Sequence, residues 1–206
     1  MTGLSDTPVL PATEGAGEPS AWIARWSHLV APGGAVLDIA AGSGRHARWF
    51  ASRGHPVVAI DRAQPALAAL AAMEGVEALA ADLEDGSPWP LPETRRFAAV
   101  VVTNYLYRPL MPRLAQLLAP GGILLYETFA RGNETVGKPS NPAFLLAPGE
   151  LLEAAYGQLR VVAYEDGYVA VPRPAFVQRM CAALPASASA QSAIEGTALA
   201  RYDLVG

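Results

Sequence analysis

Two glycines stand where a nucleotide-type ligand could be held. Gly42 and Gly44 follow a short apolar run, Ala35–Ile39, and precede a helical stretch. Glycines at such a junction allow a tight turn and a close approach of the backbone to a ligand, and the helix beyond offers free N–H groups to an anion. The spacing Gly42-x-Gly44-x-x-Ala47 matches the dinucleotide-binding fingerprint, so the loop alone leaves several cofactors open.

Three aspartates narrow this choice. Asp38 lies inside the first apolar run, four residues before Gly42, where a pyrophosphate would need neutral surroundings. A carboxylate there suits a ligand with a positive end, such as the methionine part of S-adenosylmethionine, better than a nicotinamide or flavin dinucleotide. Asp61 stands 61 − 44 = 17 residues beyond Gly44, near the ~20 typical of a carboxylate that accepts ribose hydroxyls. Asp82 follows a third apolar run, so three successive runs each have an acid at or near their end.

The scarcity of lysine and cysteine excludes several kinds of protein. A short-chain dehydrogenase needs Tyr-x-x-x-Lys, and because Lys138 is the only lysine, the tyrosine would have to stand at position 134. That residue is Glu134, which excludes the short-chain dehydrogenases. Cys181 is the only cysteine, which excludes intramolecular disulfides, cysteine-cluster zinc sites and iron–sulfur clusters. We expect no metal site.

The elements that must position these residues follow an alternating pattern. Short apolar runs separated by helical stretches predict a doubly wound α/β domain with a mostly parallel sheet, which binds ligands at the carboxyl ends of its strands. The last two runs have no helix between them and predict an antiparallel hairpin at one edge. The expected strands are Ala35–Ile39, Pro56–Ile60, Val76–Ala80, Ala98–Thr103, Ile123–Thr128, Leu159–Tyr164 and Val177–Leu184. The expected helices are Arg45–Ser52, Pro65–Met73, Leu110–Leu118 and Leu151–Tyr156.

Composition places these elements in one domain. The chain has 206 residues, of which 51% are hydrophobic and 17% charged, and its formal net charge is −4. We expect a domain over residues 19–185, a loose arm over 1–18 and a tail over 186–206. No uncharged apolar run reaches the ~20 residues of a membrane span, and the N-terminus lacks a secretory pattern, so we expect a cytoplasmic protein without a membrane partner. The mild acidity disfavours a nucleic-acid partner, although a local patch of Arg95, Arg96 and Arg108 stays open.

The segments after the fourth and fifth expected strands carry the candidate residues for chemistry. Tyr105 and Tyr107 could shape a pocket, and Arg108 could hold an anionic group. Glu127 ends the fifth strand, and the irregular stretch from 130 to 142 that follows it contains Arg131. A loop of this length in a compact domain is usually functional, so we interpret it as a substrate lid.

At this point the sequence resembles the class I S-adenosylmethionine-dependent methyltransferases. Their first motif, acidic-x-Gly-x-Gly-x-Gly, corresponds to Asp38-Ile-Ala40-Ala-Gly42-Ser-Gly44, with alanine at the first glycine. The resemblance implies a Rossmann-like seven-strand fold, S-adenosyl-L-methionine as cofactor, and an acidic residue after the third strand that takes the adenine amino group. The cofactor residues so implied are Asp38, Ala40, Gly42, Ser43, Gly44, Asp61, Arg62, Asp82, Leu83 and Asn104.

Within that class, several segments look like the small bacterial tellurite-resistance-type methyltransferases and their uncharacterised relatives. The segments are Gly42–Ala47, Arg53–Val57, Tyr126–Phe129, Arg131–Pro142 and Phe144–Leu151. The resemblance covers residues 33–184 and is specific for the cofactor site, whereas for the substrate it is only suggestive.

The sequence thus predicts a methyltransferase that acts on a small-molecule acceptor. Methyl transfer from a sulfonium needs mainly alignment and exclusion of water, and we find no acid/base dyad; His46 is expected to meet the cofactor rather than the acceptor. The candidate catalytic residues are Tyr105, Tyr107, Arg108, Glu127 and Arg131. An RNA or protein methyltransferase is one alternative. The others are a non-catalytic protein that binds S-adenosylmethionine and an NAD(P)-dependent oxidoreductase.

Overall fold

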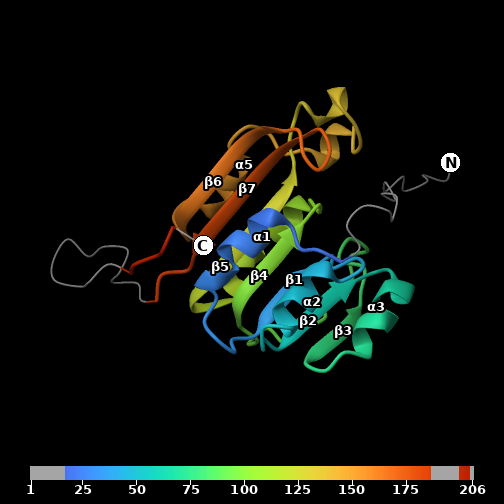
Figure 1. The fold of residues 1–206 in the computed structure, drawn as a ribbon, viewed down its shortest axis with the longest axis vertical. Helices are drawn as coiled ribbons and strands as arrows, with labels where there is room; N and C mark the ends of the chain where they lie inside the picture. The colour runs from blue at the N-terminus through green and yellow to red at the C-terminus, as the bar shows by residue number, and fades with distance from the viewer. Residues whose placement is uncertain (1–16, 187–199, 205–206) are drawn as a thin grey trace.

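A seven-stranded sheet in the order β3-β2-β1-β4-β5-β7-β6 organises the part of the chain that the structure describes, residues 17–186 and 200–204 of a computed structural model (Figure 1). The first five strands run parallel, and the last two run antiparallel to their neighbours. The strands are β1 Val36–Ile39, β2 Val57–Asp61, β3 Val76–Ala80, β4 Phe97–Thr103, β5 Leu118–Phe129, β6 Arg160–Val169 and β7 Ala175–Ala183.

Helices cover both faces of the sheet because the inner strands are apolar on both sides. In β4, Val100 and Val102 pack into one core and Val101 into the other, and all three are fully buried or nearly so. One face carries α1 (Ala21–Trp26), η1 (Ser27–Leu29), α2 (Arg45–Ala51) and α3 (Gln64–Ala71). The other face carries η2 (Arg108–Leu110), α4 (Met111–Leu114), η3 (Ala115–Leu117) and α5 (Glu150–Ala155). Two further 3₁₀ turns, η4 (Asn133–Thr135) and η5 (Pro142–Phe144), lie in the loop after β5.

The predicted fold class and antiparallel hairpin are confirmed, and two helical segments differ from the prediction. The expected helix Leu110–Leu118 is one α turn between two 3₁₀ turns, and the chain enters β5 already at Leu118. Helix α1 was not predicted; its first turn is capped by Ser20, whose hydroxyl accepts a hydrogen bond from the Trp22 N–H. Within the predicted hairpin, the later strand β7 pairs with β5, and β6 forms the edge of the sheet.

The described end segments contact the domain. Arg160 Nη1 donates a 2.9 Å hydrogen bond to the carbonyl oxygen of Ala200, and His28 Nε2 lies 3.0 Å from that of Asp203. Part of the expected tail therefore packs beside η1 and β6. Most of the expected arm and the rest of the tail lie outside the described residues. No described helix combines the length and the apolar character that crossing a membrane requires.

Candidate functional site

A buried carboxyl group stands at the centre of the candidate site. Asp38 in β1 is 1% exposed, and neither of its carboxyl oxygens has a hydrogen-bond partner among the described residues. Burial raises the pKa of Asp38 to about 7, and the backbone N–H of Ala47 and the charge of Arg45 offset only part of this effect. A buried carboxylate with no side chain paired to it is unfavourable, so this group favours a cationic partner.

The loop after β1 presents open backbone beside this carboxyl group. Gly42 takes a left-handed conformation (φ 55°), and a Cβ built there would meet nothing within 4 Å. At Gly44 (φ 77°) a Cβ would lie 2.3 Å from Leu70 Cδ2, so only glycine lets α2 start against α3. Ala40 also lies in the left-handed region, with φ 55°, where alanine is disfavoured by roughly 1–2 kcal/mol. Ser43 is exposed, and its carbonyl oxygen accepts a hydrogen bond from Arg48.

Asp61 connects the end of β2 to this loop. Its Oδ2 accepts a 2.7 Å hydrogen bond from the Gly42 N–H, and its Oδ1 accepts one of 2.8 Å from the Ala63 N–H. Because a carboxylate offers about four acceptor positions, both oxygens can still accept from ribose hydroxyls. These two hydrogen bonds hold the Asp61 carboxylate against the loop, and its remaining acceptor positions are available to a ligand.

The loop after β3 brings the third acid to the same edge of the sheet. Asp82 Oδ1 accepts a 2.9 Å hydrogen bond from the Glu84 N–H, and Oδ2 lies 3.9 Å from Arg62 Nη1. Leu83 between them is half-buried and packs against the core. The three acids therefore lie at or near the carboxyl ends of three neighbouring strands, as the sequence predicts.

The segment after β4 forms the next wall of the site. Asn104 is exposed and left-handed (φ 53°), and its N–H donates to the carbonyl oxygen of Glu127. Burial, together with the nearby carboxylate of Glu84, raises the pKa of the Tyr105 hydroxyl far above its usual value. The hydroxyl of Tyr126 donates a 2.9 Å hydrogen bond to the Tyr105 carbonyl oxygen. Tyr105 is therefore a neutral hydrogen-bond donor beside the third-strand loop.

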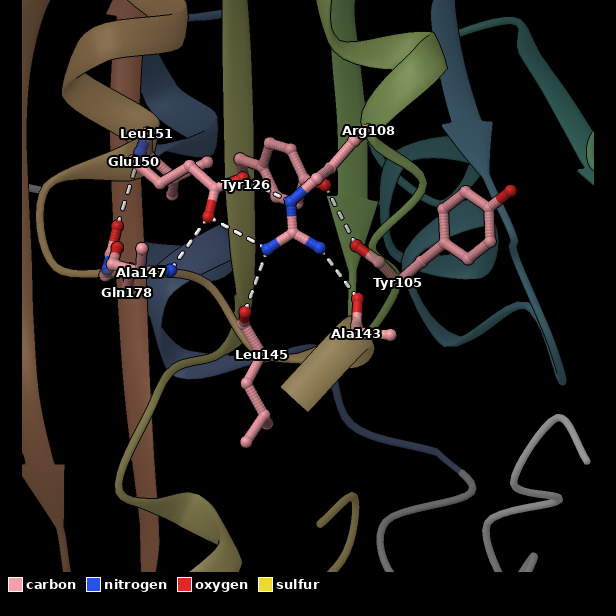
Figure 2. Close-up of polar contacts among 9 residues, drawn as sticks. All are labelled: Tyr105, Arg108, Tyr126, Ala143, Leu145, Ala147, Glu150, Leu151 and Gln178. Atoms are coloured by element: carbon pink, nitrogen blue, oxygen red, sulfur yellow. Dashed lines mark hydrogen bonds and ion pairs between the residues drawn. The ribbon is translucent and has the colours of Figure 1, made fainter. Parts of the chain in front are cut away.

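The guanidinium of Arg108 is hydrogen-bonded to other residues of the same chain. Nε and Nη2 donate to Oε1 and Oε2 of Glu150 at 2.7 and 3.0 Å, Nη1 donates to Ala143 O at 2.8 Å, and Nη2 donates to Leu145 O at 2.9 Å (Figure 2). Most of the guanidinium donors are therefore engaged within the protein rather than open to an anionic ligand. Tyr107, one position earlier, is half-buried against the core.

The remaining candidate catalytic residues do not gather around Arg108. Glu127 is 8% exposed and pairs with Arg179, whose Nε lies 2.6 Å from Glu127 Oε2. Arg179 also pairs with Glu165 on β6, at 3.2 Å. This pair lies on the α1 side of the sheet, opposite to the face of Tyr126. Arg131 is exposed after β5, and its charge contributes to lowering the pKa of Glu150.

His46 lies under the loop rather than in the site. It is 1% exposed; Nε2 accepts a 3.2 Å hydrogen bond from the Ser20 N–H, which leaves the proton on Nδ1, 3.3 Å from Thr103 Oγ1. Burial, with the charge of Arg45, lowers its pKa to about 3. The expectation that His46 meets the cofactor is therefore wrong: it connects the start of α1 to α2 and β4.

The long loop after β5 is anchored along its length. Ala130 forms a bridge with Leu146, and the buried Asn133 donates to Pro139 O at 2.9 Å. Gln178 in β7, which the sequence did not indicate, is fully buried; its Nε2 donates to Ala147 O at 2.6 Å, and its Oε1 accepts from the Leu151 N–H at 3.3 Å. In the sequence, the one indication of this role is an amide side chain among the apolar residues of the last expected strand.

Comparisons with known proteins agree with this geometry. Residues 36–122 match the family model described as a methyltransferase domain. No curated protein matches the sequence significantly. Among solved structures, TehB from Haemophilus influenzae superposes with a TM-score of 0.61 at 18% identity, over 77% of this chain and 59% of that one.

Two other structures have related folds. A 1,6-didemethyltoxoflavin-N1-methyltransferase from Burkholderia thailandensis, with bound 1,6-didemethyltoxoflavin and S-adenosylhomocysteine, gives a TM-score of 0.56 at 23% identity, over 77% of this chain and 74% of that one. A TehB-like methyltransferase from Corynebacterium glutamicum gives 0.56 at 16% identity, over 77% and 84%. Identities this low show a shared fold.

The fold and the positions of the acids agree with the family match. Residues 36–122 match a methyltransferase domain, and the sheet is that of the class I S-adenosylmethionine-dependent methyltransferases. The residues present fit S-adenosylmethionine as a cofactor, because no side chain pairs with Asp38, Gly42 leaves open space, and Asp61 retains acceptor capacity. Among the described residues, no cluster of three potential metal ligands is found.

Proposed function

We propose that this protein transfers a methyl group from S-adenosylmethionine to a small-molecule acceptor. The acceptor would bind between the segment after β4 and the loop over residues 130–149. The buried, partnerless carboxyl group of Asp38 carries the cofactor half of this proposal, because such a group is stabilised by a cationic ligand such as the ammonium of the methionine part.

The residues that would hold the cofactor line the carboxyl ends of β1, β2, β3 and β4. Asp38 would take the ammonium, Asp61 the ribose hydroxyls, and Asp82 with Leu83 the adenine. Ala40, Gly42, Ser43 and Gly44 would supply the backbone surface, with Arg62 and Asn104 at its margins. When bound, S-adenosylmethionine supplies a methyl group activated by its positive sulfur.

The proposed contribution of the protein to the reaction is alignment and exclusion of water. Tyr105 and Tyr126 have raised pKa values and so stay protonated near neutral pH, and His46 is buried with both ring nitrogens engaged. Glu127 is paired with Arg179. No described group at the ends of β4 and β5 is arranged as a general base, which favours an acceptor that is already nucleophilic, such as a thiolate.

Two observations favour a small acceptor over a nucleic acid. The three arginines of the possible basic patch are engaged: Arg95 with Glu77, Arg96 with backbone carbonyls, and Arg108 with Glu150. Among the structural neighbours, the Burkholderia methyltransferase has 1,6-didemethyltoxoflavin and S-adenosylhomocysteine bound. An RNA acceptor would show strongly salt-dependent binding.

Calorimetry tests the cofactor half. The wild type is titrated with S-adenosylmethionine, S-adenosylhomocysteine, NADH and FAD, and only the first two should bind. Asp61→Ala should weaken binding by about 10–100-fold, since it removes acceptors for ribose hydroxyls. Glu77→Gln, which changes an acid at the other end of β3, should leave it unchanged. Binding of NADH alone, or full affinity in Asp61→Ala, would refute the proposal.

A screen identifies the acceptor. Thiols, oxyanions, small acids and tRNA are each incubated with the protein and S-adenosylmethionine, and formation of S-adenosylhomocysteine is measured. A thiol or another small nucleophile should give turnover. Turnover with tRNA alone would make the protein an RNA methyltransferase, and cofactor binding without turnover on any acceptor class would favour a non-catalytic binding protein.

A further inference from the structure

The chain segment over residues 142–151 is fixed from three sides. From the end of β4, Arg108 reaches the carbonyl oxygens of Ala143 and Leu145 and the carboxylate of Glu150. From β7, the buried amide of Gln178 binds the backbone on both sides of Glu150 (Figure 2). From β5, the Phe129 carbonyl accepts from the Leu146 N–H at 3.0 Å. Residues 142–151 are therefore held in place at the carboxyl end of the sheet, and this segment is called the wall below.

Glu150 is the point where these connections meet. Its Oε2 accepts from Arg108 and also from the Ala147 N–H at 2.8 Å. Burial raises the pKa of Glu150, but the hydrogen bonds from Arg108 and from the Ala147 amide outweigh it and hold the pKa below its usual value. Glu150 is thus ionised at neutral pH, and its charge remains opposite the guanidinium.

The segment that carries Arg108 is itself attached to the cofactor side. Three residues before Arg108, the half-buried ring of Tyr105 packs against the same core as Leu83, and its hydroxyl lies near the carboxylates of Glu84 and Asp82. The Tyr126 hydroxyl holds the backbone of Tyr105 from β5. One short segment, 105–108, therefore contacts the third-strand loop at one end and the 142–151 wall at the other.

We propose that Arg108 is a positioning residue that couples the cofactor pocket to the acceptor wall, so that binding of the cofactor stabilises the wall against which the acceptor lies. The inference rests on the proposed function, since it assigns residues 142–151 to the acceptor side. It gives Arg108 a role through Glu150 and two carbonyl groups rather than through contact with the substrate. The forked guanidinium is required, because an ammonium cannot reach both carboxylate oxygens and both carbonyls in this fixed geometry.

Hydrogen exchange measures this coupling without an acceptor. Adding S-adenosylhomocysteine to the wild type should slow exchange at the amides of Leu145, Leu146 and Ala147 as well as at the glycine loop. In Arg108→Ala those wall amides should exchange about tenfold faster, and the ligand should no longer slow them, because four hydrogen bonds from one partly exposed group are lost. Affinity for S-adenosylhomocysteine should stay within about twofold, as Arg108 touches none of the proposed cofactor residues.

Two further variants and one control keep the test decisive. Arg108→Lys should give intermediate exchange, and Glu150→Gln should loosen the wall while keeping the volume of the side chain. Arg95→Ala removes another arginine–glutamate pair, with a 2.8 Å contact to Glu77, and should leave the wall unchanged. With the acceptor found in the screen, Arg108→Ala should raise the KM for the acceptor and not that for S-adenosylmethionine.

The outcomes separate the two proposals. If S-adenosylhomocysteine does not bind the wild type, the proposed function fails. If it binds, but the wall amides in Arg108→Lys and Glu150→Gln exchange and respond to it as in the wild type, the coupling role of Arg108 is refuted. If Arg108→Ala does not fold, those two variants decide the question, because each retains a partner for the opposite group.

Discussion

Replacing Asp38 with asparagine should stabilise the ligand-free protein at neutral and alkaline pH. Burial raises the pKa of Asp38 from 3.8 to about 7, so the native state holds a proton that the unfolded chain releases in this interval. Stability therefore falls as the pH rises from about 4 to about 7, by about 4 kcal/mol at 1.36 kcal/mol per pKa unit. Asparagine cannot ionise and escapes this loss, so the variant should gain up to about 4 kcal/mol at pH 8 and little at pH 4.

Urea unfolding of both proteins without ligand, at several pH values between 4 and 8, measures this difference. The gap between the two unfolding free energies should widen with pH and level off above about pH 7. Glu77→Gln, in which an exposed acid is changed, serves as the control and should show no such widening. A gap that is constant with pH, or a variant less stable than the wild type at pH 8, would show that the Asp38 carboxyl is not the strained group inferred from its burial.

The same carboxyl should make cofactor binding pH-dependent. A bound ammonium favours the ionised form of Asp38, so S-adenosylhomocysteine should bind more tightly as the pH rises from 6 to 8 and should release a proton near pH 6. Calorimetry in two buffers with different ionisation enthalpies counts that proton. Asp38→Asn should bind more weakly and release none. Equal proton release by both proteins would contradict the assignment of Asp38 to the ammonium.

Three smaller changes test other parts of the structure. Ala40→Gly should leave stability unchanged or raise it by up to about 1 kcal/mol in thermal unfolding, because relief of the left-handed strain outweighs the added freedom of the unfolded chain. His46→Ala should destabilise by about 2–4 kcal/mol, since it opens a cavity and leaves two buried partners unbonded; a loss under about 0.5 kcal/mol would contradict its buried role. Tyr126→Phe should lose about 1 kcal/mol by removing the hydrogen bond to Tyr105, with cofactor affinity unchanged in calorimetry.

The sequence predicted the strands well where burial leaves a continuous apolar run. The strand Val76–Ala80 was predicted with the bounds observed, and β4 was predicted to start one residue too late. The start of β5 was hidden because Ala-Pro-Gly-Gly over 119–122 has the composition of a turn. In the structure this stretch lies within β5, where the register with β4 shifts. Helix α1, six residues long, was not predicted.

The positions of the three acids could be predicted and the contacts of the proposed acceptor side could not, for one physical reason. The carboxyl ends of parallel strands lie at the same edge of the sheet. Residues that follow neighbouring strands are therefore close together, however long the chain between them is. The roles of Arg108 and Gln178 instead depend on partners 27 to 42 residues away, in the stretch that runs from η5 to the start of α5. The burial of His46 depends on Ser20, 26 residues earlier, in a segment with no predicted element.

The position of β7 between β5 and β6 has a consequence for the order in which the protein can be completed during synthesis. The antiparallel partner of β5 begins at Ala175, 175 − 129 = 46 residues after β5 ends, so a growing chain leaves the buried strand β5 with an unpaired backbone edge until then. The strands that carry the proposed cofactor residues, β1 to β4, all precede Asn104 and can form while the chain is still emerging from the ribosome. Nascent chains halted before Ala175 should therefore carry an assembled glycine loop beside an aggregation-prone sheet edge.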